Sequence, residues 1–177
     1  CKNGLVGNKI VFPIVSVGAT ENTIMAASLA KGRTQIINAA REPEIIDLGN
    51  CLNEMGAKIT GHGTDNINID GVDTLSGASH SVIADRIEAG TFAIAAAVTQ
   101  GDITLRDINP VYLNALFAVL EQTGATIQIG EDWARISSDA RAKSVDIATQ
   151  PYPGFPTDLQ AQYMCLMATA DGSSKIT

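Results

Sequence analysis

The chain has 177 residues, of which 12 are Lys or Arg and 19 are Asp or Glu, so its formal net charge is −7. Hydrophobic residues make up 45% of the sequence and charged residues 18%, a balance that allows a substantial core and excludes a disordered chain. An acidic chain with few, dispersed basic residues is also a poor candidate for binding nucleic acid or an anionic membrane surface.

The apolar segments and the cysteines exclude two further classes. The longest apolar stretch, the Ala-rich run 92–98, is far shorter than the roughly 20 residues that a membrane-spanning helix needs. The three cysteines, Cys1, Cys51 and Cys165, are widely spaced, and the sequence has only two histidines. We therefore expect no metal site and no cofactor, and the sparse cysteines favour a reducing, cytoplasmic compartment.

An internal repeat organises the sequence. Apolar helix-like runs at 23–32, 92–101 and 163–172 each end in Gly, and an aliphatic residue follows four positions later. A second marker, Leu-x-x-x-Gly-Ala-x-Ile, occurs at 52–59 and again at 120–127. In this marker Gly56 and Gly124 stand where the C-terminus of a helix needs a left-handed residue.

These markers predict one order of elements: strand, buried helix, strand, amphipathic helix, strand, strand. Pro43 and Pro110 fit the first turns of the amphipathic helices, and strands are expected at 9–12, 58–61, 66–70, 126–129 and 134–137. The helix that ends at Gly32 is apolar nearly all round, which predicts that it is buried inside a bundle ringed by sheets and amphipathic helices. The third repeat stops in mid-strand at Thr177, so we expect a fragment of a longer protein.

The most specific segment is Pro-Tyr-Pro-Gly-Phe-Pro-Thr-Asp-Leu-Gln-Ala-Gln at 151–162. Its prolines predict a stiff loop, and Thr157 and Gln160 fit a capping box at the start of a helix. Asp158 would then lie in the first turn, where a carboxylate simply stabilises the helix dipole. The functional alternative is a carboxylate that accepts a proton from a substrate hydroxyl.

A second candidate segment is Val-Ser-Val-Gly-Ala-Thr at 15–20, between the first strand and the first helix. Ser16, Gly18 and the backbone amides of such a turn can bind an anion, although an ordinary helix cap is the alternative. The charged clusters at 41–44 and 85–88 are interpreted as caps and surface ion pairs. We expect His62 and His80 to face solvent and Cys51 and Cys165 to lie in the core.

Taken together, these segments resemble the UDP-N-acetylglucosamine enolpyruvyl transferase family. The matching stretches run in family order at 16–20, 38–47, 56–61, 63–65, 85–91 and 154–162. The resemblance implies an α/β fold made of repeated β-α-β-α-β-β units. These units would form part of a two-domain, inside-out α/β barrel of the enolpyruvyl transferase type. By this comparison, residues 1–83 are the last repeat of the first domain, which carries the UDP-sugar and cysteine-loop sites. Residues 84–177 begin the second domain with one full repeat and a truncated one.

The resemblance also implies an activity: transfer of the enolpyruvyl group of phosphoenolpyruvate to the 3-hydroxyl of UDP-N-acetylglucosamine, the first committed step of peptidoglycan synthesis. Asp158 matches the general base of the family, and Thr157 lies beside it in the substrate site. The turn that holds the UDP portion matches Val15, Ser16, Val17 and Gly18.

The reactive cysteine of the family lies upstream of Cys1, so we expect this chain to be inactive alone. Two alternatives stay open. The first is a shikimate-3-phosphate enolpyruvyl transferase, which shares the fold and the chemistry. The second is a non-catalytic repeat module that binds a nucleotide sugar.

Overall fold

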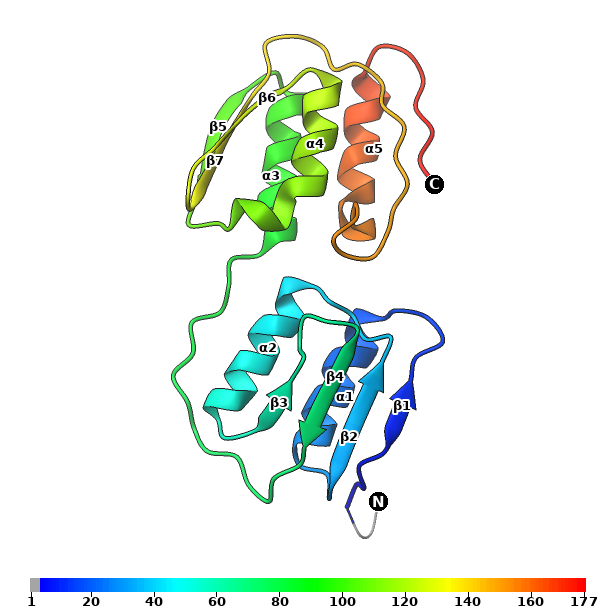
Figure 1. Cartoon of the computed structure of the whole chain (residues 1–177). Helices are drawn as coiled ribbons and strands as arrows, with labels where there is room; N and C mark the ends of the chain where they lie inside the picture. Colours follow the sequence, from blue (N-terminus) through cyan, green and yellow to red (C-terminus); the bar gives the residue numbers. More distant parts are fainter. Residues whose placement is uncertain (1–3) are drawn as a thin grey trace. The chain divides into compact units, whose positions relative to one another are not determined.

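The computed structural model describes residues 4–177, so Cys1 lies outside the described residues. The chain divides into two compact units, Cys1–Ile83 and Ala84–Thr177 (Figure 1). Each unit has its own sheet and its own hydrophobic core. Among residues 4–177, the helices are all too short or too polar to cross a membrane.

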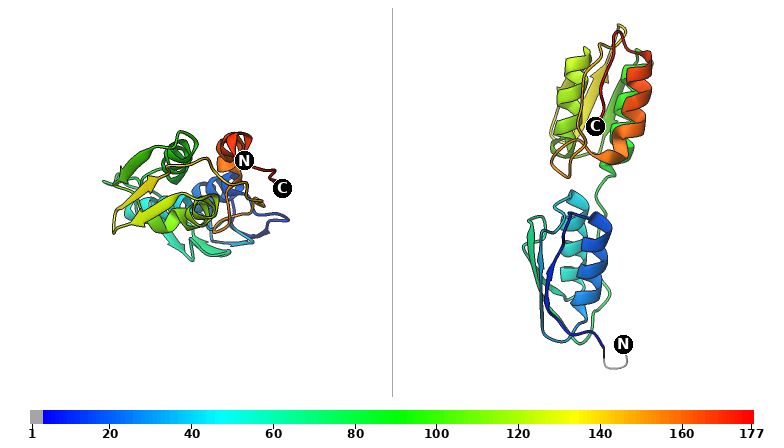
Figure 2. Two further views of the ribbon diagram at one scale, coloured as in Figure 1. Left: turned by 90° about the horizontal axis from the view of Figure 1, so that it is seen from above. Right: turned by 90° about the vertical axis from the view of Figure 1, so that its right-hand side faces the viewer.

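The first unit has the element order that the sequence predicts for one repeat. It runs β1 (Lys9–Val11), α1 (Val17–Ser28), β2 (Arg33–Ile37), α2 (Pro43–Glu54), β3 (Lys58–Thr60) and β4 (Asn66–Asp70). The strand order in its sheet is β1-β2-β4-β3, with β1 parallel to β2 and the other pairs antiparallel. Helices α1 and α2 lie side by side on one face of this sheet (Figures 1 and 2).

Alternation along the strands builds the core of the first unit. Ile36 on β2 lies opposite Ile67 on β4, and both side chains are fully buried. Helix α1 adds Ile24 and helix α2 adds Ile45 from the side of the sheet that the helices cover. Pro43 occupies the first turn of α2, as predicted, because that position needs no amide proton.

The second unit has the same succession of helix, strand, helix and two strands. Its elements are α3 (Arg86–Val98), β5 (Asp102–Arg106), the 3₁₀ turn η1 (Pro110–Leu113), α4 (Asn114–Thr123), β6 (Thr126–Ile129), β7 (Trp133–Ser137), the 3₁₀ turn η2 (Thr157–Leu159) and α5 (Gln160–Thr169). The strand order is β5-β7-β6, and both pairs are antiparallel. Helix α3 contacts the sheet as well as α4 and α5.

Local turn chemistry is confirmed at the second sequence marker. Gly124 caps α4 with φ +104°, and Gly56 follows α2 with φ +102°, both in the left-handed region. An added Cβ would meet no described atom within 4 Å at either position, so the backbone angle alone favours glycine.

The prediction of an apolar helix buried on all sides is wrong for α1. The helix buries Thr20, Ile24, Ala27 and Ser28, whereas Met25 is 46% exposed. The same holds in the second unit, where Phe92 on α3 is 54% exposed and Met164 on α5 is 52% exposed. The physical reason is that each sheet covers only one side of the helices in its own unit.

Candidate functional site

The turn at Ser16 joins β1 to α1 and is shaped by the side chain of Ser16. This residue is the N-cap of α1, in extended conformation, and its Oγ accepts a hydrogen bond of 3.3 Å from the amide of Ala19. The amide of Thr20 donates to the Ser16 carbonyl at 3.0 Å. The amides of Val17 and Gly18 belong to the same first turn, where the helix itself offers no acceptor.

Two neighbours of Ser16 differ in burial. Val15 packs against the core of the first unit, which anchors the turn from inside. Gly18 is exposed, and an added Cβ there would meet no described atom within 4 Å. The turn therefore presents its backbone amides on an open surface, a geometry that suits an anion.

The turn at Asp158 differs from the predicted capping box. Pro156, with φ −73° and ψ 142°, is the N-cap of η2, and among the described residues no side chain caps η2 or α5. The amide of Leu159 instead donates to the carbonyl of Pro156 at 3.1 Å, and the amide of Gln160 donates to that of Thr157. The capping box is wrong because a 3₁₀ turn precedes α5 and satisfies these amides with backbone carbonyls. Thr157 and Asp158 are both exposed.

Helix α3 contacts this turn on its buried side. Leu159 is 1% exposed and packs on Gly90, where an added Cβ would come within 2.7 Å of Leu159 Cδ1. Gln162, one helical turn after Asp158, donates from Nε2 to Thr91 Oγ1 at 2.9 Å. The side chain of Asp158 thus sits on a turn that is packed against α3 on its buried side.

Aromatic side chains fix the loop that leads into the turn. The rings of Phe155 and Tyr163 meet edge to face, with centroids 5.5 Å apart. The Tyr163 hydroxyl donates to the carbonyl of Val145 at 2.7 Å, and burial, followed by the charge of Asp146, raises the Tyr163 pKa to about 12. Tyr163 is therefore a neutral structural residue at physiological pH.

The charged clusters at 41–44 and 85–88 are only partly surface features. Asp85 caps α3 as predicted, since its Oδ1 accepts from the amides of Ile87 and Glu88 at 2.7 and 3.1 Å. Arg86, however, is only 8% exposed, and its guanidinium carbon lies 5.5 Å from the ring centroid of Tyr152. Glu42 is likewise only 5% exposed. The prediction of a surface position is therefore wrong for these two residues, and for Arg86 the ring of Tyr152, distant in sequence, provides part of the cover.

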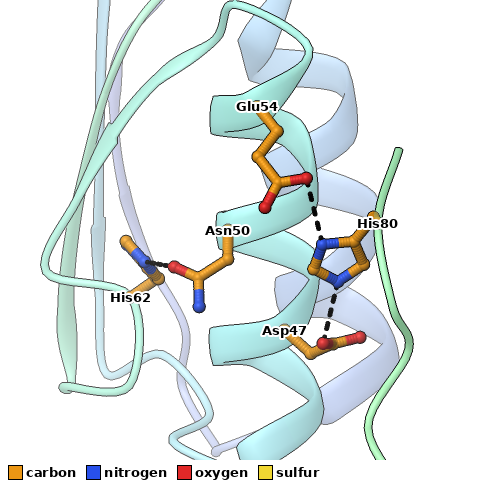
Figure 3. Close-up of polar contacts among 5 residues, drawn as sticks. All are labelled: Asp47, Asn50, Glu54, His62 and His80. Carbon is orange, nitrogen blue, oxygen red and sulfur yellow. Dashed lines mark hydrogen bonds and ion pairs between the residues drawn. The ribbon is translucent and has the colours of Figure 1, made fainter. Parts of the chain in front are cut away.

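The two histidines also depart from the prediction of solvent-facing side chains (Figure 3). The His80 side chain is 13% exposed, with Nε2 2.9 Å from Asp47 Oδ1 and Nδ1 3.3 Å from Glu54 Oε2. The hydrogen bond to Asp47 is the largest of several effects that together raise the His80 pKa. His62 is half-buried beside Asn50, with Nε2 3.0 Å from Asn50 Oδ1, and burial lowers its pKa.

The cysteines are less buried than predicted. Cys51 on α2 is half-buried, whereas Cys165 is exposed on the open side of α5. Both thiols are free. The prediction of a core position is therefore wrong for Cys165, for the same reason as for Met164 beside it.

The structure brings the predicted site residues together in two groups. Val15, Ser16, Val17 and Gly18 form the turn in the first unit, and Thr157 and Asp158 lie on η2 in the second. Thr91 and Gln162, which contact each other beneath Asp158, were not singled out by the sequence analysis. Their pairing has no local sequence signal, because 71 positions separate them.

Comparison with known proteins places both units in one family. The sequence profile of EPSP synthase (3-phosphoshikimate 1-carboxyvinyltransferase) matches residues 2–177. The UDP-N-acetylglucosamine 1-carboxyvinyltransferase of Gluconobacter oxydans is 53% identical over 99% of this chain and 42% of its own length. The protein of that name from Shewanella woodyi is 56% identical over 98% of this chain, again spanning 42% of the relative. The chain thus spans about two fifths of the length of these relatives.

Solved structures show the same fold. The enolpyruvyl transferase NikO from Streptomyces tendae superposes with a TM-score of 0.75 at 20% identity, over 90% of this chain and 39% of that one. EPSP synthase from Acinetobacter baumannii gives a TM-score of 0.60 at 21% identity, over 98% of this chain and 41% of that one. The expected α/β, enolpyruvyl transferase-like fold is confirmed. The chain belongs to the EPSP synthase (3-phosphoshikimate 1-carboxyvinyltransferase) family.

Proposed function

We propose that this chain forms part of an enzyme that transfers the enolpyruvyl group of phosphoenolpyruvate to the 3-hydroxyl of UDP-N-acetylglucosamine. The observation that carries this proposal is the 53–56% identity, over nearly the whole chain, to relatives named for this reaction. In the reaction the hydroxyl oxygen adds to C2 of phosphoenolpyruvate while C3 gains a proton. The tetrahedral intermediate then loses phosphate, and a proton leaves C3.

Asp158 is the general base in this proposal. A sugar hydroxyl is very weakly acidic, so a carboxylate within hydrogen-bond reach must take its proton as the oxygen attacks. Asp158 is exposed on η2, and among the described residues no side chain or amide is bonded to its carboxylate. Thr157 beside it is a substrate-binding residue through its exposed side chain.

The turn at 15–18 binds the diphosphate of the UDP portion. The amides of Val17 and Gly18 and the Ser16 hydroxyl are the donors, and the positive end of the α1 dipole adds to them. The glycine at position 18 supports this role. Alanine would stabilise the helix more, and no described atom of the chain lies within 4 Å of an added Cβ, so packing within the chain does not explain the glycine. Glycine at this position suits close approach of a ligand to the backbone.

The cellular setting follows from the reaction. We place the enzyme in the cytoplasm and in cell wall biogenesis, and hence in the control of cell shape and division. Its partners are the two small anionic substrates, UDP-N-acetylglucosamine and phosphoenolpyruvate. We expect neither nucleic acid nor a membrane as a partner, given the net charge of −7.

A second candidate has one observation in its favour. The family profile that matches residues 2–177 is described by the 3-phosphoshikimate reaction. Against it, the EPSP synthase of Acinetobacter baumannii is 21% identical to this chain, whereas the Gluconobacter oxydans relative is 53% identical. The shikimate-3-phosphate reaction is therefore the alternative outcome of the test, together with a non-catalytic nucleotide-sugar module.

The test uses a chimera in which residues 1–177 replace the matching segment of the Gluconobacter oxydans relative. We expect phosphate release from phosphoenolpyruvate with UDP-N-acetylglucosamine and none with shikimate 3-phosphate, while the 177-residue chain alone has no turnover. The unmodified relative controls for assay conditions, and circular dichroism establishes that the chimera folds. A folded chimera without turnover favours the binding module, and release with shikimate 3-phosphate favours the other enzyme.

A second experiment addresses the general base. Asp158→Ala in the chimera should lower kcat by about 10²–10⁴-fold, the usual contribution of such a base. Asp139→Ala is the matched control, because Asp139 is an exposed carboxylate in the same unit. Turnover of Asp158→Ala within twofold of the parent chimera would remove Asp158 from the mechanism.

A further inference from the structure

We infer that Thr91 and Gln162 form a positioning pair that fixes the turn on which Asp158 lies. This inference rests on the proposed role of Asp158 as general base. It adds two residues on two helices that are distant in sequence, and it assigns them an effect on the rate of the chemical step rather than on substrate binding.

The direction of the hydrogen bond between the two residues is determined by the network around Thr91. The Thr91 hydroxyl has one proton, which it donates to the carbonyl of Ile87 at 2.8 Å. Its oxygen must then accept from Gln162, whose Nε2 lies at 2.9 Å. This bond orients the Gln162 carboxamide and ties the first turn of α5 to the middle of α3.

Close packing provides a second contact between α3 and the turn, next to the hydrogen bond. Gly90 precedes Thr91 on α3, and Leu159 follows Asp158 on η2. A methyl group at Gly90 would come within 2.7 Å of Leu159 Cδ1, so the Leu159 side chain packs directly on the α3 backbone and would have to shift if Gly90 carried a side chain. The two contacts lie one and four residues after Asp158, and together they fix the turn from beneath.

The absence of a local cap makes these distant contacts decisive. Among the described residues, no side chain caps η2 or α5. The orientation of the turn therefore depends on its contacts with α3 as well as on the loop that leads into it. A general base acts only within hydrogen-bond reach of the proton that it takes, and a displacement of about 1 Å can lower the rate by about 100-fold.

The test replaces the hydroxyl of Thr91 with a methyl group in the chimera. We expect Thr91→Val to lower kcat by about 10- to 100-fold while KM for both substrates changes less than about twofold. Thr91→Ser, which keeps the hydroxyl, should restore kcat to within about twofold of the parent. Thr99→Val is the matched control, because Thr99 makes the same bond to the carbonyl four residues earlier, at 2.8 Å, but is exposed at the end of α3.

A double variant separates positioning from stability. Thr91→Val combined with Gln162→Leu removes both partners, which leaves no unpaired buried amide and should cost little stability. The positioning role predicts that kcat stays low in this variant although its urea midpoint returns toward that of the parent. Recovery of kcat together with the midpoint would instead show a merely structural role and overturn the inference.

A readout without catalysis uses the 177-residue chain itself. Thr91→Val should accelerate hydrogen exchange at the amides of Leu159 and Gln160, while exchange in α4 and β7 stays unchanged. Unaltered exchange at these two amides, or kcat within twofold of the parent in the chimera, would overturn the inference. Failure of Asp158→Ala to lower kcat would instead refute the proposed base, so the two failures are distinguishable.

Discussion

The two candidate turns begin helices in different ways. In the first unit, Ser16 caps α1 with its own side chain, so the turn is determined within the four consecutive residues from Ser16 to Ala19. In the second unit, the turn at Asp158 has no side-chain cap among the described residues and depends on Gly90 and Thr91 of α3. The difference shows that the conformation of the first turn is encoded locally, whereas that of the second depends on tertiary packing within its own unit.

The largest effect should come from filling the contact beneath Asp158. Gly90→Val would place methyl groups against Leu159 Cδ1 and Leu116 Cδ2, which lie within 2.7 and 3.1 Å of an ideal Cβ. We expect the free energy of unfolding of the second unit to fall by about 2–3 kcal/mol, the usual cost of overpacking. The single tryptophan, Trp133 on β7, reports on this unit in a urea titration followed by fluorescence.

The first unit serves as the internal control for that variant. Its amide hydrogen exchange, measured at buried residues such as Ile24 and Ile36, should be unchanged by Gly90→Val. A urea midpoint equal to that of the unmodified chain would mean that the close approach of α3 and η2 is not needed for the fold.

Removal of hydroxyl groups tests the comparison directly. Ser16→Ala should cost the first unit about 1 kcal/mol, because the amide of Ala19 loses its acceptor. Thr157→Ala should change the stability of the second unit by less than about 0.5 kcal/mol, since Thr157 caps no helix. Hydrogen exchange measures the first effect and Trp133 fluorescence the second. Equal losses at the two positions would contradict a local cap at one turn only.

Gly18 offers a smaller effect of opposite sign. Gly18→Ala should stabilise the first unit by about 0.5–1 kcal/mol, because alanine favours a helix and no described atom lies within 4 Å of the added Cβ. The same change in the chimera should raise KM for UDP-N-acetylglucosamine, since the methyl group would face the diphosphate. Greater stability without any change in KM would mean that Gly18 does not face a ligand.

The same distinction explains which features could be predicted from the sequence. The left-handed Gly56 and Gly124, Pro43 in its first turn and the Ser16 cap depend on neighbours a few residues away. The predictions for the two glycines and Pro43 are confirmed, and the helix cap, the alternative for Ser16, is observed. The capping box at Thr157 satisfied the same local rules, yet the stiff prolines and the packing on α3 selected a 3₁₀ turn instead.

Burial of charged and polar side chains was harder to predict. Arg86 meets Tyr152, and His80 meets Asp47 from 33 positions away, so no spacing rule could indicate either contact. The exposure of Met25 and Phe92 is also not predictable from the sequence, because an apolar pattern predicts a helix but not which side of that helix a sheet will cover.

The smallest effect is a pH dependence that arises from the two histidines of the first unit. Asp47 and Glu54 raise the His80 pKa above its ordinary value of 6.5, so His80 stabilises the fold fully below pH 6.5 and loses this contribution as the pH rises through its folded pKa. Burial lowers the His62 pKa, so its contribution is present above pH 6.5 and is lost as the pH falls through its folded pKa. An NMR titration of the imidazole protons should therefore give two midpoints on opposite sides of 6.5.

Two substitutions of a carboxylate by a carboxamide test which contacts set the pKa of each histidine. Asp47→Asn removes the strongest acceptor of His80, so its pKa should fall toward 6.5, and Glu54→Gln should lower it by less. Neither change should move the midpoint of His62, because its polar partner is the neutral side chain of Asn50, twelve positions away. If Asp47→Asn shifted both midpoints equally, the two rings would be responding to the net charge of α2 rather than to the contacts that distinguish them.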